Sequence, residues 1–112
     1  MKKNHILKKN EDYNRIIQNI TPLKYKDYLI YLERTNDDSY YFGFSVGKKV
    51  GNAVTRNKIK RQLKNILREN SYQNGFNCII MVKKGILEKE FPIRRKYLLE
   101  AIDKLKIVKE KK

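Results

Sequence analysis

The sequence predicts an α+β fold, a two-layer sandwich in which about three helices pack against a small mixed sheet. Apolar residues recur at helical spacing in three segments, and β-branched or aromatic runs occupy three others. The order along the chain is helix, hairpin, helix, strand and helix. The 112 residues, 40% of them hydrophobic, suffice for one core, and neither a repeat nor a linker divides them. We therefore expect a single domain over 1–112, with residues 1–9 and 108–112 flexible.

The first helix is expected to begin at Asn10, a residue type that caps helix N-termini, and to stop before Thr21. Its apolar side chains form two rows, which are Ile16 with Ile20 and Tyr13 with Ile17. All four residues could belong to the core. A helix lying across the edge of a sheet could instead bury one row and leave the other lining a groove.

Two strands are expected at Tyr28–Arg34 and Tyr40–Val46, joined through a polar turn as an antiparallel hairpin. Alternation places the bulky side chains of the second strand on one face and leaves Gly43 and Ser45 on the other. A face this bare is either covered by a closely packed element or open as a trough for a ligand. The residues of the first strand that could flank the trough are Leu29 and Tyr31.

A basic turn punctuated by glycines, Gly47–Asn52, then leads into a helix expected from about Ala53 to Arg68. A strand, a glycine-rich turn and a helix N-terminus together favour an anion site. The turn does not match a nucleotide-binding P-loop. GFSVGKK has three residues between its glycines instead of four, and no Ser or Thr follows its lysines.

The segment Asn77–Lys83 is apolar on both faces, which is typical of a buried strand that could pair parallel to an earlier one. Cys78 in this strand is expected to be a small core residue. The last helix should begin near Pro92, a residue type favoured in the first helical turn. Its inward row would be Leu98, Ile102 and Leu105.

The charge balance is strongly basic, with 27 Lys and Arg against 12 Asp and Glu and a net charge of +15. AT-rich coding could explain part of this excess, because most of the cations are lysines. The placement is more informative, since residues 39–68 contain no Asp or Glu. The cations of this span are Lys48, Lys49, Arg56, Lys58, Lys60, Arg61, Lys64 and Arg68. The absence of carboxylates would favour binding of phosphates to this surface.

The helix expected at 53–68 has one apolar and one cationic face. The apolar face consists of Ile59, Leu63, Ile66 and Leu67. A basic amphipathic helix can be merely solvated, or it can bind a membrane surface or an acidic protein. The apolar face has no aromatic anchor and is needed for the core, which argues against a membrane role. Neither a membrane span nor a secretory signal is evident, and the single cysteine favours the cytoplasm.

Candidate catalytic and metal-ligating residues are few. A metal-independent nuclease needs a pair of acid and base groups, and the only histidine is His5. A metal-dependent nuclease needs converging carboxylates. The acidic pairs are better explained by a helix start, by a turn and by a solvated segment. We therefore expect neither a catalytic residue nor a metal site in this chain.

The stretch Phe42–Leu67, FGFSVGKKVGNAVTRNKIKRQLKNIL, resembles the signature of the bacterial ribonuclease P protein subunit. The family's core helix carries Arg-Asn-x-x-Lys-Arg-x-x-Arg, which Arg56, Asn57, Lys60 and Arg61 match. The chain departs from the pattern at three positions. These are Lys64 in place of Arg, Gly47 in place of Ser, and Ile6 where Arg often stands. The segment Leu7–Tyr13 also resembles the family's N-terminal segment, with Tyr13 in place of the usual Phe.

This resemblance implies an α+β sandwich containing a left-handed βαβ crossover. It also implies a subunit of the ribonucleoprotein that removes the 5′ leader from precursor tRNA, in which the RNA subunit performs the hydrolysis with Mg²⁺ and no protein partner is required. The helix would face that RNA through Arg56, Asn57, Lys60, Arg61, Lys64 and Arg68. The leader would lie between the first helix and the sheet, against Tyr13, Ile17, Leu29, Tyr31, Ser45, Lys48 and Lys49.

Two other functions would fit the charge, size and fold class. One is a structural RNA-binding protein of the ribosome. The other is a DNA-binding protein that places the 53–68 helix in a groove.

Overall fold

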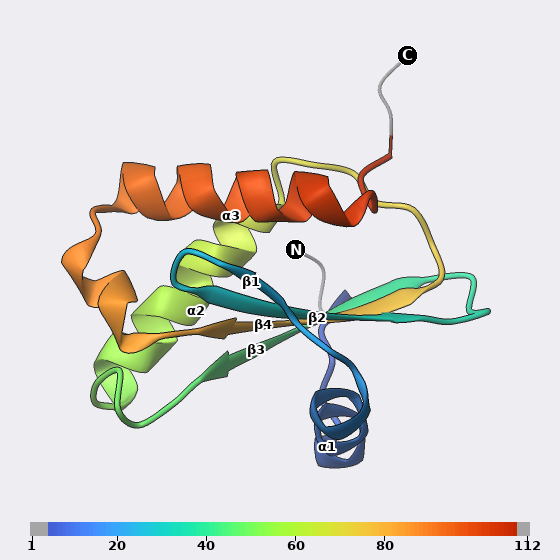
Figure 1. Ribbon diagram of the computed structural model, residues 1–112, viewed down its shortest axis with the longest axis horizontal. Coiled ribbons are helices and arrows are strands. Elements are labelled where there is room, and N and C mark those ends of the chain that lie inside the picture. The colour runs from blue at the N-terminus through green and yellow to red at the C-terminus, as the bar shows by residue number, and fades with distance from the viewer. Residues whose placement is uncertain (1–4, 110–112) are drawn as a thin grey trace.

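The computed structural model describes residues 5–109, which form one sheet with helices on both of its faces (Figure 1). The α+β class, the mixed sheet and three α-helices are confirmed. The elements are α1 (Asn10–Asn19), β1 (Leu23–Tyr25), β2 (Tyr28–Arg34), β3 (Tyr40–Val46), α2 (Ala53–Leu67), β4 (Phe76–Val82), the 3-10 helix η2 (Lys84–Glu88) and α3 (Phe91–Leu105). None of the helices in residues 5–109 is long and apolar enough to span a membrane.

The strand order is β1-β2-β4-β3, so the predicted hairpin between β2 and β3 is wrong. β4 lies between these two strands, antiparallel to β2 and parallel to β3. The expected parallel pairing of this buried strand with an earlier one is therefore confirmed. Because β3 and β4 are parallel neighbours joined through α2, the chain contains a βαβ crossover. The left hand of that crossover stays a prediction from the resemblance.

Gly75 explains how β4 enters between the two strands. Its carbonyl accepts a hydrogen bond from the Thr35 N–H at 2.9 Å, where β2 has just ended, and its own N–H donates to Ser39 O at 2.8 Å, just before β3 begins. Gly75 has a φ of +88°, and a β-carbon there would lie 2.9 Å from the Thr35 carbonyl oxygen. Only glycine meets both conditions without strain. The polar turn between β2 and β3 thus bonds to Gly75 instead of closing a hairpin.

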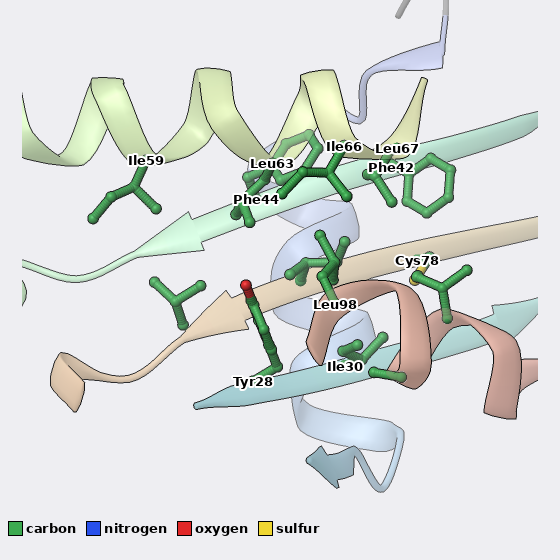
Figure 2. Packing of buried hydrophobic residues seen from close by; sticks show 14 of the residues in the cluster. Tyr28, Ile30, Phe42, Phe44, Ile59, Leu63, Ile66, Leu67, Cys78 and Leu98 are labelled. Atoms are coloured by element: carbon green, nitrogen blue, oxygen red, sulfur yellow. The ribbon is translucent and has the colours of Figure 1, made fainter. Parts of the chain in front are cut away.

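Two apolar clusters occupy the two faces of the sheet. The larger one joins the sheet to α2 and α3 and includes all four predicted apolar residues of α2 (Figure 2). The smaller one lies under α1 on the opposite face, around Ile16, Tyr31 and Ile79. The two-layer description therefore covers only the side of α2 and α3, because α1 adds a third layer (Figure 1). The core placement of Cys78, which is fully buried, is confirmed.

The two ends of the described chain contact the body of the protein. Ile6 bridges Phe42 in parallel, and the Leu7 N–H donates to Phe42 O at 2.8 Å, so this segment covers the outer edge of β3. Val108 bridges Tyr72 in the antiparallel sense. Residues 1–4 and 110–112, which we also expected to be flexible, lie outside the described residues.

Candidate nucleic-acid interface

The helix α2 presents the cationic face that the sequence predicted. The Asn52 side chain caps the helix by accepting from the Thr55 N–H at 2.9 Å, and four buried apolar residues anchor it to the sheet. Three of the predicted contact residues are exposed, namely Asn57, Arg61 and Arg68, and three are half-buried, namely Arg56, Lys60 and Lys64. Packing of the apolar arc therefore holds the cationic arc in a fixed orientation.

Two of the half-buried cations are held against the protein surface. The Lys64 ammonium nitrogen lies 5.9 Å from the centroid of the Phe44 ring, a cation–π distance. The Nε atom of Arg56 is buried and has no hydrogen-bond partner within residues 5–109. Its N–H is thus one donor that the fold leaves unused on the side predicted to meet RNA.

The turn between β3 and α2 carries the exposed lysines Lys48 and Lys49. The Val50 N–H donates to Gly47 O at 3.0 Å, and the buried Val50 side chain fixes the turn to the core. A β-carbon at Gly47 would meet nothing within 4 Å. The Ser that the family usually carries at this position would therefore fit, so packing does not require Gly47.

Tyr13 of α1 covers the bare face of β3. A β-carbon at Gly43 would lie 2.7 to 2.9 Å from Tyr13 ring and hydroxyl atoms, so the ring rests directly on the glycine backbone. The Tyr13 hydroxyl donates to Leu7 O at 3.1 Å and accepts from the Phe44 N–H at 3.2 Å. Burial raises the pKa of Tyr13, although the Phe44 hydrogen bond opposes this. The bare face of β3 is therefore covered by a packed element at Gly43 and is not an open trough there.

Register places the predicted leader-binding residues of the sheet in two rows across β2, β4 and β3. Tyr31, Ile79 and Gly43 form one row, and Leu29, Met81 and Ser45 form the next. The first row lies beneath α1, where Tyr31 is only 8% exposed and Ile79 is fully buried. Tyr31 therefore holds α1 on the sheet and offers little of its ring to a ligand. The second row, Leu29, Met81 and Ser45, is half-buried, and we call it the half-buried row.

Met81 is the residue of this row that the sequence did not single out. It lies directly between Leu29 and Ser45 because β4 separates β2 from β3. Alternation along β4 already places Met81 on the face of α1, but only the strand order makes it the centre of the row. Ile17 of α1 is also half-buried and packs against the same cluster as Met81 and Leu29. Neither alternative for the four apolar residues of α1 holds fully: only Ile16 is fully buried, whereas Tyr13, Ile17 and Ile20 are half-buried.

The two candidate surfaces lie on opposite faces of the sheet, with α2 on one and α1 on the other (Figure 1). The turn Gly47–Asn52 connects β3, which carries Ser45, to the start of α2. Its lysines therefore stand between the two surfaces. One molecule could accordingly contact two separate polyanionic segments at once.

The acid and base candidates are engaged in local structure. The His5 ring stacks on Tyr40 with centroids 4.0 Å apart, and its Nδ1 donates to Tyr40 O at 2.9 Å. Asp12 pairs with Arg15 instead of capping α1, whose N-cap is Lys9 and not the expected Asn10. Within residues 5–109, no group of three His, Cys, Asp or Glu side chains could hold a metal ion.

Sequence comparisons relate nearly the whole chain to one family. The profile of a family described as Ribonuclease P matches residues 1–106. The ribonuclease P protein component of Mycoplasma mycoides subsp. mycoides SC is 40% identical over 110 residues, which cover 95% of this chain and 100% of that protein. The component of Streptococcus mutans is 30% identical over 111 residues, which cover 98% of this chain and 93% of that protein.

Solved structures show the same fold. The RNase P protein of Staphylococcus aureus superimposes with a TM-score of 0.83 at 24% identity, covering 94% of this chain and 98% of that one. The RNase P protein of Thermotoga maritima superimposes with a TM-score of 0.75 at 24% identity, covering 86% of this chain and 93% of that one.

Proposed function

Because the chain belongs to the ribonuclease P protein family, we propose that it is the RNA-binding subunit of a tRNA-processing ribonucleoprotein and binds two RNA segments, the RNA subunit and the 5′ leader of precursor tRNA. The observation that carries this proposal is the placement of the acid-free cationic helix α2 and the half-buried row on opposite faces of one sheet. The family match favours this function over the ribosomal and DNA-binding alternatives. A cytoplasmic location is part of the proposal.

The cationic face of α2 is proposed to bind the RNA subunit. A folded RNA presents phosphates at fixed positions, so cations on a rigid helix bind it with less loss of backbone conformational entropy than cations on a mobile loop would. The anchoring of α2 by four buried residues supplies that rigidity. The exposed guanidinium of Arg61 offers donors suited to phosphate oxygens.

The half-buried row is proposed to hold the leader. A single strand has unpaired bases, which gain from apolar contact, and phosphates, which gain from nearby cations. Leu29 and Met81 offer apolar surface, and Lys48 and Lys49 follow Ser45 closely along the chain. We expect bases to meet the row and phosphates to meet the turn. Tyr13 is proposed to border this contact, while Tyr31 supports it from below by holding α1.

Hydrolysis is proposed to belong to the RNA subunit, as the family resemblance implies. Bound Mg²⁺ would supply the activated water and the charge neutralisation that phosphodiester hydrolysis needs. Residues 5–109 bring together no group of three His, Cys, Asp or Glu side chains that could hold a metal ion. The contribution proposed for the protein is binding of RNA.

The test is reconstitution with the RNA subunit and precursor tRNA at low Mg²⁺. We expect the chain to increase the rate of leader removal and to increase affinity for precursor tRNA more than for mature tRNA. Failure to stimulate cleavage would overturn the proposal as a whole. Equal effects on precursor and mature tRNA would overturn the assignment of the leader.

A charge substitution tests the half-buried row itself. Ser45→Asp places a carboxylate in the acid-free span, and we expect it to weaken precursor binding about fivefold, which corresponds to ~1 kcal/mol for a solvent-accessible charge. Ser45→Lys should strengthen binding, and neither change should affect mature tRNA. Ser71→Asp is the matched control, because Ser71 is exposed and lies in the loop after α2. Equal losses for Ser45→Asp and Ser71→Asp would indicate a general charge effect and refute the row.

A further inference from the structure

A cavity of about 440 Å³ lies on the face of α1, at the end of the sheet opposite to the half-buried row. Its wall is built by the segment preceding α1, by α1 itself and by β2, β4 and β3, where Glu33, Asn77 and Tyr41 form a third row across the sheet. Small-molecule sites commonly have volumes of ~300 to 1,000 Å³. The cavity thus has the size of a ligand site, and neither proposed RNA contact above uses it.

The charges of this cavity differ from those of the protein as a whole. Three cations and three anions line it, although the chain carries +15: these are Lys8, Lys9, Arg15, Asp12, Glu33 and Asp37. A formally neutral wall is not a site for a polyphosphate. It suits a neutral polar group that offers both donors and acceptors.

Three of the six charged side chains are already paired with each other. The Arg15 guanidinium donates to Glu33 at 2.9 and 3.1 Å and to Asp12 at 2.8 Å. The Asn77 amide donates to the same Glu33 carboxylate at 2.9 Å. These bonds lower the pKa of Glu33 and hold it ionised. The network forms a rigid wall, and its carboxylates have little capacity left for a ligand.

The groups left for a ligand are acceptors within the cavity and cations at its N-terminal side. Within residues 5–109, neither the Asp37 carboxylate, the Asn77 Oδ1 nor the Tyr41 hydroxyl makes a hydrogen bond. Asn77 is also the one buried polar residue of the described chain, at 8% exposure. Its Nδ2 donates to Glu33, which leaves Oδ1 as the acceptor that this side chain can offer a ligand.

We propose that this cavity binds a guanine base of single-stranded RNA, with the base against Tyr41, its Watson–Crick edge on Asp37 and a neighbouring phosphate on Lys8 and Lys9. Single-stranded bases are recognised by stacking on aromatic rings and by hydrogen bonds to their edges. Guanine alone presents two adjacent donors, N1–H and the N2 amino group, that match the two oxygens of one carboxylate. Uracil would set carbonyl oxygens against Asp37, and adenine or cytosine would offer a single amino donor.

The proposal rests on the proposed function only in naming RNA as the source of the guanine base. The binding test itself needs neither the RNA subunit nor tRNA, so the two can fail separately. The full chain is titrated with GMP, IMP and UMP, and the side-chain amide resonance of Asn77 is followed by NMR. IMP lacks the N2 amino group of the base and is otherwise identical to GMP. We expect GMP to shift the resonance and to bind about 5- to 100-fold more tightly than IMP, the usual range for losing a recognised donor, while UMP binds more weakly still.

The matched variants are Asp37→Asn and Asp38→Asn. Both residues are exposed in the same turn, but only Asp37 lines the cavity. Asp37→Asn should abolish the preference for GMP over IMP, and Asp38→Asn should preserve it. No response of Asn77 to GMP, or equal affinity for GMP and IMP in the unsubstituted chain, would overturn the site.

A second arm distinguishes RNA from a free nucleotide as the source. The trinucleotide UGU is compared with UIU and with GMP. Tighter binding of UGU than of both supports an RNA segment, because the flanking phosphates reach Lys8 and Lys9. Binding of UGU no tighter than GMP would overturn the assignment to RNA in favour of a free guanine nucleotide.

Discussion

The contact between Tyr13 and Gly43 yields a quantitative prediction for Gly43→Ala. The new β-carbon would lie 2.7 to 2.9 Å from the Tyr13 ring and hydroxyl. Carbon atoms pack at about 3.5 Å or more, so the ring must retreat by about 0.7 Å. A retreat of this size lengthens the two hydrogen bonds of the hydroxyl, at 3.1 and 3.2 Å, beyond useful range. Overpacking costs ~1 to 3 kcal/mol and each lost hydrogen bond ~1 kcal/mol.

Alanine also regains ~0.5 to 1 kcal/mol because it restricts the unfolded chain more than glycine does. We therefore expect Gly43→Ala to lower the free energy of unfolding by about 3 kcal/mol. The assay is equilibrium unfolding in urea, monitored by circular dichroism. Gly47→Ala is the matched control, because nothing lies within 4 Å of its β-carbon position. It should leave stability unchanged or slightly raised.

A double-mutant cycle assigns the cost to the ring. In a Tyr13→Ala background the obstruction is gone, so Gly43→Ala should become neutral or stabilising, with a coupling of about 3 kcal/mol or more between the two positions. If Gly43→Ala costs no more than Gly47→Ala, or if its cost persists undiminished without the Tyr13 ring, Tyr13 does not rest on β3 as described.

Three further predictions address the basic helix and the ion pair of α1. Arg61→Ala should weaken binding of the RNA subunit and reduce the slope of log K against log salt by about one counterion. Lys58→Ala, on another side of α2, is the control and should change this slope less. Equal slopes for the two variants would contradict a phosphate contact at Arg61. Asn52→Ala removes the cap of α2 and should cost ~1 kcal/mol in urea unfolding, and an unchanged midpoint would mean that the cap is not used. The Arg15 guanidinium lowers the pKa of Glu33 in the folded state. The free energy of unfolding lost in Glu33→Gln should therefore be constant above about pH 5 and should disappear as the pH falls through the folded pKa. A loss that grows on acidification would contradict this prediction.

Local patterns in the sequence were sufficient for the three α-helices, for strands β2, β3 and β4 and for the cationic face of α2, but they did not indicate β1 or η2. The predicted apolar arc of α2 is buried in full, and its cationic arc follows from that burial by helical geometry alone. Alternation along β3 likewise predicted which side chains enter the larger core. These predictions depend only on spacing along one element, which is why no tertiary information was needed.

Tertiary structure decided which strands are neighbours, and through this the second surface. Alternation determines the face of a residue but not the strand beside it, so the sequence predicted a hairpin where Gly75 brings β4 between β2 and β3. That insertion places Met81 at the centre of the half-buried row and Asn77 in the wall of the cavity. The family resemblance places Tyr31 against the leader, but α1 lies over this residue and leaves it 8% exposed. Burial depends on contacts between segments distant along the chain, which periodicity within a single segment does not encode.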